Sequence, residues 1–338
     1  MPYVSVDNVA AMVTGREVFG FFKDHRNNMP VVVGVDEAGK TTTIDLDTVY
    51  SIIVSGVPRS GKSWFVQMIM ALLAALNSPK DLQFLLIDAK DGTSDFTVVS
   101  DLPHVIGFAG TRQDALASLQ WVERVEAPRR KDLMAASNKT KYQDYNDDLV
   151  GDEVKIPLLW VGNDEMTSFA SSMAPDEKKE FFNLLNMLIS QYPSLGIRVI
   201  LLPHRIVNDI IPKTASTLVP FKIGVQAEIG EIVNAFDIRA SDFPYKLSHP
   251  GDMAVKSKNI NGGSTKYLHS PMLSDSSGQN RKIFGAIARM WSQLEPDVRP
   301  HFGLVSARKT WGTPPVREKA YAGSTSDVPL APAVPAMQ

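Results

Sequence analysis

Short apolar runs alternate along the chain with longer stretches in which apolar residues recur every three or four positions. The short runs occupy residues 51–55, 83–88, 156–161, 197–202 and 221–225. Runs of this kind are typical of strands buried on both faces of a parallel sheet. The longer stretches, 64–76, 111–136 and 176–192, have helical spacing, although Pro128 is expected to break or offset the second. Strands that alternate with helices predict an α/β fold with a mainly parallel sheet flanked by helices.

The ends of the chain have different patterns. Residues 30–35 and 41–46 are rich in β-branched side chains and flank a turn that contains Gly39, which predicts a hairpin. A short helix is expected around residues 15–22. From residue 312 onward Pro, Ala, Ser and Thr dominate without periodicity, which predicts a disordered tail. The predicted organisation is therefore a lead segment over 1–29, one α/β domain over 30–300 and a C-terminal segment over 301–338.

Composition limits the classes of protein that the chain can belong to. Its 338 residues are 44% hydrophobic and 21% charged, which suits a globular protein with a sizeable core. The net charge of −2 means that any nucleic-acid surface must be local. The absence of cysteine excludes disulfides and thiolate metal sites. The most apolar run, 65–76, is shorter than the roughly 20 residues of a membrane span, and no signal-peptide pattern is present, so we expect a cytoplasmic protein.

A complete phosphate-loop motif lies between the first predicted strand of the parallel sheet and the first long helix. It has the pattern G-x-x-x-x-G-K-S and consists of Gly56, Val57, Pro58, Arg59, Ser60, Gly61, Lys62 and Ser63. A glycine turn that begins a helix directs free backbone N–H groups and the positive end of the helix dipole at one point. We therefore predict a nucleoside triphosphate site. Lys62 would contact the β- and γ-phosphates, and the Ser63 hydroxyl would bind Mg²⁺.

Acidic residues end two of the predicted strands. Asp164 and Glu165 follow the apolar run that begins at Ile156, and Asp88 ends the run before it. Asp164 is the predicted second ligand of Mg²⁺, with Asp88 as the alternative, and Glu165 is the predicted base that polarises the attacking water. An adjacent acidic pair is costly unless a cation compensates it, as Mg²⁺ would. The alternative is that Asp164 and Glu165 only begin a helix.

Two further strand ends are predicted at the same edge of the sheet. Asp88-Ala89-Lys90 follows the second strand, and His204 and Arg205 follow the fourth. Ligands of open parallel sheets bind beyond the carboxyl ends of the strands, so these residues should converge on the nucleotide. His204 is expected to contact the γ-phosphate, and Arg205 to stabilise developing charge in its own subunit or in a neighbouring one.

Several motifs in their order along the chain resemble those of the FtsK/SpoIIIE motor ATPases. The resemblance extends over about residues 30–290 and is carried by residues 84–90, Leu102-Pro103-His104, Ala115-Leu116, Trp121-Val122-Glu123, Arg129-Arg130, Asp164-Glu165, residues 196–205 and Gly251-Asp252-Met253. It implies a RecA-like P-loop domain that hydrolyses ATP with Mg²⁺ and assembles as a homo-oligomeric ring, a hexamer or a pentamer, around the polymer that it moves. It also implies that Lys62, Ser63, Asp164 and Glu165 have the roles given above, and that Arg205 matches the family's arginine.

The sequence departs from the family pattern at several positions. His204 stands where the family usually has glutamine, and Lys222 and Gly230-Glu231 stand where it often has arginine. The arginine finger therefore remains open among Arg205, Arg239 and Arg129. The membrane segments and winged-helix domain of chromosomal members have no counterpart here, which predicts a nearly bare motor.

Double-stranded DNA is the expected substrate, because most of the family moves DNA. A moving motor needs few, basic contacts to phosphates, and a basic cluster precedes the acidic strand: Arg129, Arg130, Lys131, Lys139 and Lys141. The alternative is a solvated helix end. The expected setting is phage genome packaging or plasmid transfer, with attachment through a portal or membrane partner. The competing hypotheses are a type VII-like protein-secretion ATPase and, more weakly, a nuclease centre at Asp88-x-Lys90.

Overall fold

The computed structural model describes residues 29–88, 95–150, 154–164, 170, 172–204, 218–271, 273 and 276–295. The predicted lead segment, apart from Met29, lies outside the described residues, as do the expected helix near residue 20 and the C-terminal segment from 301. No helix in the described part of the chain combines the length and apolarity that a membrane crossing requires.

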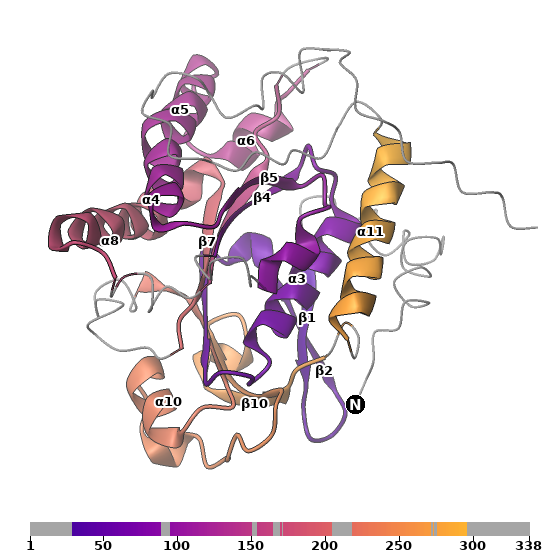
Figure 1. Ribbon diagram of the computed structural model, residues 1–338, viewed down its shortest axis with the longest axis vertical. Coiled ribbons are helices and arrows are strands. Elements are labelled where there is room, and N and C mark those ends of the chain that lie inside the picture. Colours follow the sequence, from indigo (N-terminus) through magenta and orange to yellow (C-terminus); the bar gives the residue numbers. More distant parts are fainter. Residues whose placement is uncertain are drawn as a thin grey trace, which may run out of the picture.

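A ten-stranded sheet runs through the molecule in the order β2-β1-β10-β9-β8-β3-β7-β6-β4-β5 (Figure 1). The strands are β1 (Pro30–Val35), β2 (Thr41–Asp45), β3 (Ser51–Gly56), β4 (Leu82–Asp88), β5 (Val105–Ala109), β6 (Leu158–Asp164), β7 (Ile197–Leu202), β8 (Phe221–Val225), β9 (Asp252–Ser257) and β10 (Lys266–His269). The neighbours from β8 to β5 pair in parallel, whereas those from β8 to β2 pair antiparallel. The predicted α/β fold with a mainly parallel sheet and flanking helices is confirmed, with an antiparallel extension on one side.

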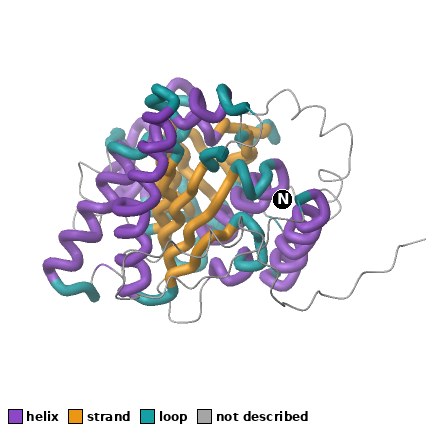
Figure 2. The backbone as a smooth tube through the Cα atoms, turned by 90° about the horizontal axis from the view of Figure 1, so that it is seen from above, coloured by secondary structure: helices purple, strands orange, loops and turns teal. Residues whose placement is uncertain are grey.

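Helices cover both faces of the parallel half (Figure 2). They are α3 (Lys62–Leu76), α4 (Arg112–Trp121), α5 (Ala127–Ala136), α6 (Tyr142–Asp147), α8 (Pro175–Ser190), α10 (Ile229–Phe236) and α11 (Ser277–Leu294). α3 and α11 pack together on one face, whereas α4 and α8 lie side by side on the other. Buried polar contacts join the first pair: Asn280 of α11 donates to Gln67 of α3 at 2.8 Å, and the Trp291 indole donates to the Ala74 carbonyl at 2.6 Å.

The helical stretch over 111–136 continues through the predicted break. α4 is followed without interruption by a π-helical segment, Val122–Glu126, and then by α5. Pro128 lacks the N–H that an α-helix would require, and the preceding turn widens so that the N–H of Ala127 bonds to the carbonyl of Val122. The helix does not break at Pro128. The other expected outcome, an offset of the helical pattern, is what the widened turn before the proline produces.

His104 is a fully buried histidine in the core between the sheet and α11. Its ring lies 6.2 Å from that of Phe84 and 6.1 Å from that of Trp291, and Nε2 hydrogen-bonds the Asn77 carbonyl at 2.8 Å. Burial lowers the pKa of His104 from 6.5 to about 4, although the hydrogen bond to Asn77 opposes the shift. The folded protein therefore favours the neutral ring, whereas the unfolded chain takes up a proton below pH 6.5.

We predict that stability falls as the pH falls from 6.5 to 4. The sign follows from the depressed folded-state pKa: the contribution of the neutral ring is complete above pH 6.5 and is lost below it. About 1.4 kcal/mol for each pH unit gives a loss of about 3 kcal/mol by pH 4. Urea unfolding of the wild type and of His104→Gln at several pH values measures this term. The exposed His249 provides the control, since His249→Ala should keep the wild-type dependence of the free energy of unfolding on pH. The same dependence in His104→Gln as in the wild type would contradict the assignment to His104.

Candidate nucleotide-binding site

Several of the predicted site residues lie along one edge of the sheet, at the carboxyl ends of the parallel strands. β3, β6 and β4 end there in Gly56, Asp164 and Asp88, and His204 lies just beyond the end of β7. The order β3-β7-β6-β4 places these ends in one row. Because the strands are parallel, every carboxyl end faces the same side, where open α/β sheets bind their ligands.

The phosphate loop joins β3 to α3 in the predicted way. α3 begins at Lys62, and its N-cap is Gly61, which has a φ of 101°. Gly56 at the start of the loop is also required, because a Cβ there would lie 2.0 Å from the Val225 carbonyl oxygen. Gly56 therefore lies too close to β8 for a larger residue, whereas the positive φ of Gly61 is what favours glycine at that position.

Hydrogen bonds hold the loop between the two halves of the sheet. The Gly56 N–H donates to the His204 carbonyl at 3.3 Å, on the β7 side. The Gly251 N–H donates to the Ser60 carbonyl at 3.1 Å, on the β9 side. The Ser60 hydroxyl is buried and has no hydrogen-bond partner among the described residues, so it is available to a ligand of the loop.

Lys62 lies inside the loop and is 7% exposed. Its Nζ donates to the Gly56 carbonyl at 2.7 Å and lies 3.5 Å from Nδ1 of His204. The structure therefore brings together two residues that the sequence places 142 positions apart. A buried ammonium at the N-terminus of a helix creates a positive site that suits a phosphate group.

Asp88 and Asp164 are neighbours at the ends of β4 and β6. They are directly opposite each other in the parallel register, and both are almost fully buried, at 1% and 2% exposure. Two adjacent buried carboxyls fit a divalent cation, which would compensate their charge. The described residues contain no group of three or more metal-ligating side chains. Mg²⁺ usually binds through one or two carboxylates together with substrate phosphates, so Asp164 with the Ser63 hydroxyl is a suitable set.

Some predicted residues lie outside the described part of the chain. Glu165, the predicted base, follows the end of β6 directly, and Arg205 follows His204 directly. Ala89 and Lys90, the remainder of the Asp88-x-Lys90 triplet, are also outside it. Their roles therefore remain sequence-based predictions.

A pocket of about 400 Å³ opens beside the phosphate loop. One wall is formed by residues 59–64 of the loop and of the first turn of α3, and the other by Pro250, Gly251 and residues 269–271. No role for this second wall could be predicted from the sequence. The only signal was the Gly251-Asp252-Met253 motif, whose last two residues begin β9, an antiparallel strand that the hydrophobic pattern did not reveal.

Comparisons with known proteins agree with this geometry. The sequence model of the FtsK/SpoIIIE family matches residues 20–202. The chain belongs to that family. Proteins described as DNA translocase FtsK are similar to it: that of Campylobacter jejuni is 25% identical over 220 residues, covering 63% of this chain and 22% of the relative. That of Helicobacter pylori is 25% identical over 295 residues, covering 87% and 33%. The chain thus spans a third or less of either relative.

Solved structures share the fold of this FtsK/SpoIIIE chain. EssC (ATPases 2 and 3) from Geobacillus thermodenitrificans has a TM-score of 0.65 at 17% identity, covering 82% of this chain and 51% of that one. The pCW3 conjugation coupling protein TcpA, with ATPγS, has a TM-score of 0.60 at 18% identity, covering 75% and 70%. These likenesses, together with the family match, confirm the prediction of a P-loop ATPase fold.

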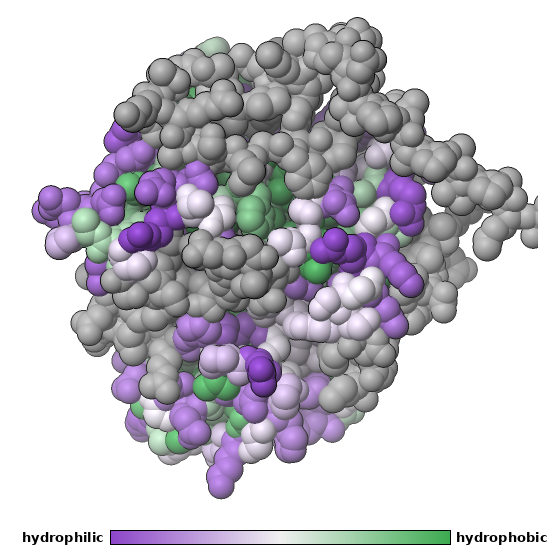
Figure 3. Space-filling model, in the orientation of Figure 1, coloured by the Kyte–Doolittle hydropathy of each residue, from purple (hydrophilic) through white to green (hydrophobic). Residues whose placement is uncertain are grey.

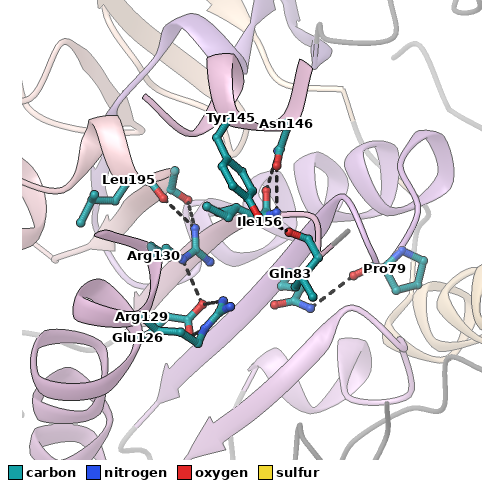
Figure 4. Close-up of polar contacts among 11 residues, drawn as sticks. Pro79, Gln83, Glu126, Arg129, Arg130, Tyr145, Asn146, Ile156 and Leu195 are labelled. Atoms are coloured by element: carbon teal, nitrogen blue, oxygen red, sulfur yellow. Dashed lines mark hydrogen bonds and ion pairs between the residues drawn. The ribbon is translucent and has the colours of Figure 1, made fainter. Parts of the chain in front are cut away.

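The structure corrects one predicted DNA contact of this family member. Arg130 is fully buried: its Nε donates to Glu126 at 2.9 Å, and its Nη1 donates to the carbonyls of Leu195 and Gly196 at 2.8 and 3.0 Å (Figure 4). These carbonyls immediately precede β7, so the contact lies at the amino ends of the parallel strands, away from the phosphate loop. The prediction that Arg130 contacts DNA was wrong, because its guanidinium ties α5 to the start of a strand.

Most of the other basic side chains in this cluster also contact residues of the same chain. Arg129 bonds to Glu126 at 2.7 Å, and Lys139 forms an ion pair with Asp148. Lys131 lies over the Tyr192 ring at 5.3 Å, and Lys141 is exposed at the N-cap of α6. Most charges of this cluster thus have partners within the chain, which favours the solvated helix end as the interpretation of this segment.

Lys222 replaces an arginine of the family pattern and has a structural role here. Its Nζ donates to the Ala235 carbonyl at 3.0 Å, and Lys256 on the neighbouring strand donates to the Phe236 carbonyl at 2.7 Å. Both cations therefore bind the C-terminal end of α10, where the helix dipole favours positive charge. Burial, with a smaller effect from Lys256, lowers the pKa of Lys222. Position 222 caps a helix in this chain instead of extending into solvent.

Proposed function

We propose that this chain is an ATP-driven motor that moves double-stranded DNA through a ring of its own copies. The observation that supports it most is the row of Lys62, His204, Asp164 and Asp88 at one sheet edge in a member of the FtsK/SpoIIIE family. The relatives named DNA translocase favour DNA as the substrate. The ring, a hexamer or a pentamer, and a portal or membrane partner are parts of the same proposal.

Hydrolysis is assigned to residues at that edge. The loop N–H groups and Lys62 bind the β- and γ-phosphates, and His204, next to Lys62, senses the γ-phosphate. Ser63 and Asp164 would hold Mg²⁺, which supplies neutralisation of phosphate charge when it is bound. Glu165 accepts a proton from the attacking water. Arg205 stabilises the charge that develops on the transferred group.

Genome packaging or plasmid transfer is the proposed setting, and protein secretion is the competing function. The fold does not separate them, because the Type VII Secretion ATPase EccC of Thermomonospora curvata and the conjugation coupling protein TcpA share it at TM-scores of 0.62 and 0.60. With a net charge of −2, the chain would contact DNA through a local basic surface and not through a large one. In Figure 3 the described residues over α8 and α11 are mainly hydrophilic, and an apolar area lies between them.

We predict that linear double-stranded DNA of random sequence raises the ATPase rate several-fold. Contacts to phosphates release counterions, so the stimulation should weaken by about tenfold or more between 50 and 200 mM salt. Steady-state ATPase assays with and without DNA measure both effects. Lys62→Ala serves as the inactive control for contaminating ATPases.

The competing function predicts the opposite pattern of stimulation. A secretion-signal peptide that raises the rate, with no response to DNA, would replace DNA translocation by protein secretion. Stimulation by DNA that persists at high salt would contradict phosphate contacts as its source.

A further inference from the structure

The pocket beside the phosphate loop extends toward the antiparallel half of the sheet. Since β9 runs antiparallel to β8, and β10 to β9, Asp252 at the start of β9 and His269 at the end of β10 lie directly opposite each other at the nucleotide edge. His269 lines the pocket together with Ser270 and Pro271. Asp252 and His269 therefore lie on the opposite side of β3 from β7 and β6.

The direction of a bound triphosphate follows from that arrangement. His204 and Asp164, which are suited to the γ-phosphate and its cation, lie on the β7 and β6 side of the loop. A triphosphate seated on the loop with its γ-phosphate toward them directs its other end toward β9 and β10. The pocket is located there and has a volume suited to a nucleoside.

His269 is held in a fixed position in this pocket by Asp252. Nδ1 of His269 lies 3.1 Å from the Asp252 carboxylate, which also accepts from the Tyr267 hydroxyl at 2.8 Å and from the backbone N–H of His249 at 2.8 Å. Burial raises the pKa of Asp252, but the hydrogen bonds from His249, Tyr267 and His269 outweigh it and keep the pKa below its usual value. The ionised carboxylate places the proton of the neutral ring on Nδ1, so Nε2 is an acceptor.

Gly251 connects this histidine to the phosphate loop. Its N–H donates to the Ser60 carbonyl, and its φ of 92° favours glycine. A Cβ at position 251 would lie 3.1 Å from Cε1 and 3.2 Å from Nε2 of His269. The imidazole therefore packs against the residue that is bonded to the loop.

We propose that His269, positioned by Asp252, forms the wall that contacts the nucleoside of the bound triphosphate and contributes to base selection. The inference rests on the proposed nucleotide site, and it adds a residue for recognition of the base or ribose. The ring offers an apolar face to a base, and Nε2 accepts from an exocyclic amino group or a ribose hydroxyl. Asp252 is a positioning residue that acts through His269.

The test compares ATP with inorganic tripolyphosphate, which carries the phosphates without a nucleoside. Isothermal titration of His269→Ala should show ATP affinity reduced about tenfold and tripolyphosphate affinity changed less than twofold. The ratio of ATP to GTP affinity should move toward one. Equal ATP affinity in wild type and variant, or equal losses for both ligands, would overturn the proposal.

Controls separate this outcome from a failure of the nucleotide site or of folding. His249→Ala removes an imidazole that is 81% exposed, outside the pocket wall and 3.4 Å from the same carboxylate, and it should leave both affinities unchanged. A wild-type chain that binds neither ligand would refute the nucleotide site itself. Should His269→Ala prove unfolded by circular dichroism, Asp252→Asn decides: the ratio of ATP to GTP affinity must move toward one while tripolyphosphate affinity stays constant, and an unchanged ratio contradicts the proposal.

Discussion

Replacing Lys62 by alanine is expected to weaken ATP binding by about a hundredfold. The ammonium is 7% exposed and is held at the centre of the phosphate loop. Removing one partner of a buried charged hydrogen bond costs about 2–5 kcal/mol, and each 1.4 kcal/mol changes a dissociation constant tenfold. Titration with ATP and a coupled ATPase assay measure the two consequences.

Two further variants serve as controls for the Lys62→Ala result. Lys246→Ala removes the same charge from an exposed position and should retain wild-type affinity. Glu165→Gln should bind ATP normally but lose turnover, since it removes the proposed base and leaves the phosphate contacts intact. Normal ATP affinity in Lys62→Ala would contradict the phosphate role of Lys62, and normal hydrolysis in Glu165→Gln would remove Glu165 as the base.

Replacing Arg130 by alanine is expected to lower the free energy of unfolding by about 3 kcal/mol or more. The guanidinium is fully buried and donates to Glu126 and to the carbonyls of Leu195 and Gly196. Its removal takes a donor from the two carbonyls and leaves Glu126 with Arg129 as its remaining partner in α5, and it creates a cavity. Urea unfolding at neutral pH measures the change.

Arg129 provides the matched control for this substitution. It bonds to the same carboxylate, but its side chain is 36% exposed, so Arg129→Ala should cost about 1 kcal/mol or less. A stable Arg130→Ala variant that has lost its stimulation by DNA would reverse the correction and restore Arg130 as a DNA contact.

The parallel half of the fold could be predicted from the sequence because its strands are buried on both faces. Continuous apolar runs such as residues 84–87 and the loop motif at 56–63 each indicate one structure. In the antiparallel half, the predicted hairpin is confirmed as β1 and β2, whereas β9 and β10 were not predicted. Three of the six residues of β9 are polar, Asp252, Lys256 and Ser257, and β10 has only four residues.

The candidate site divides in a similar way. Asp88, Asp164 and His204 lie at or just beyond the ends of apolar runs, so the rule that ligands bind at carboxyl strand ends locates them. The phosphate-loop motif locates Lys62. Asp252 and His269 reach the same edge by antiparallel pairing, which no local pattern indicates. The prediction for Arg130 failed for another reason. A run of basic residues indicates charge but not exposure, and Arg130 is buried together with its partner Glu126, one helical turn away.

The bonds from Gly56 to His204 and from Gly251 to Ser60 fix the phosphate loop to β7 on one side and to β9 on the other. A loop that is already tethered at both ends loses little conformational entropy when its ligand arrives. The main rearrangement left for binding is local, an exchange by Lys62 Nζ of the Gly56 carbonyl for a phosphate oxygen. Such a preorganised cradle favours rapid association, so affinity differences among nucleotides should appear mostly in their rates of release.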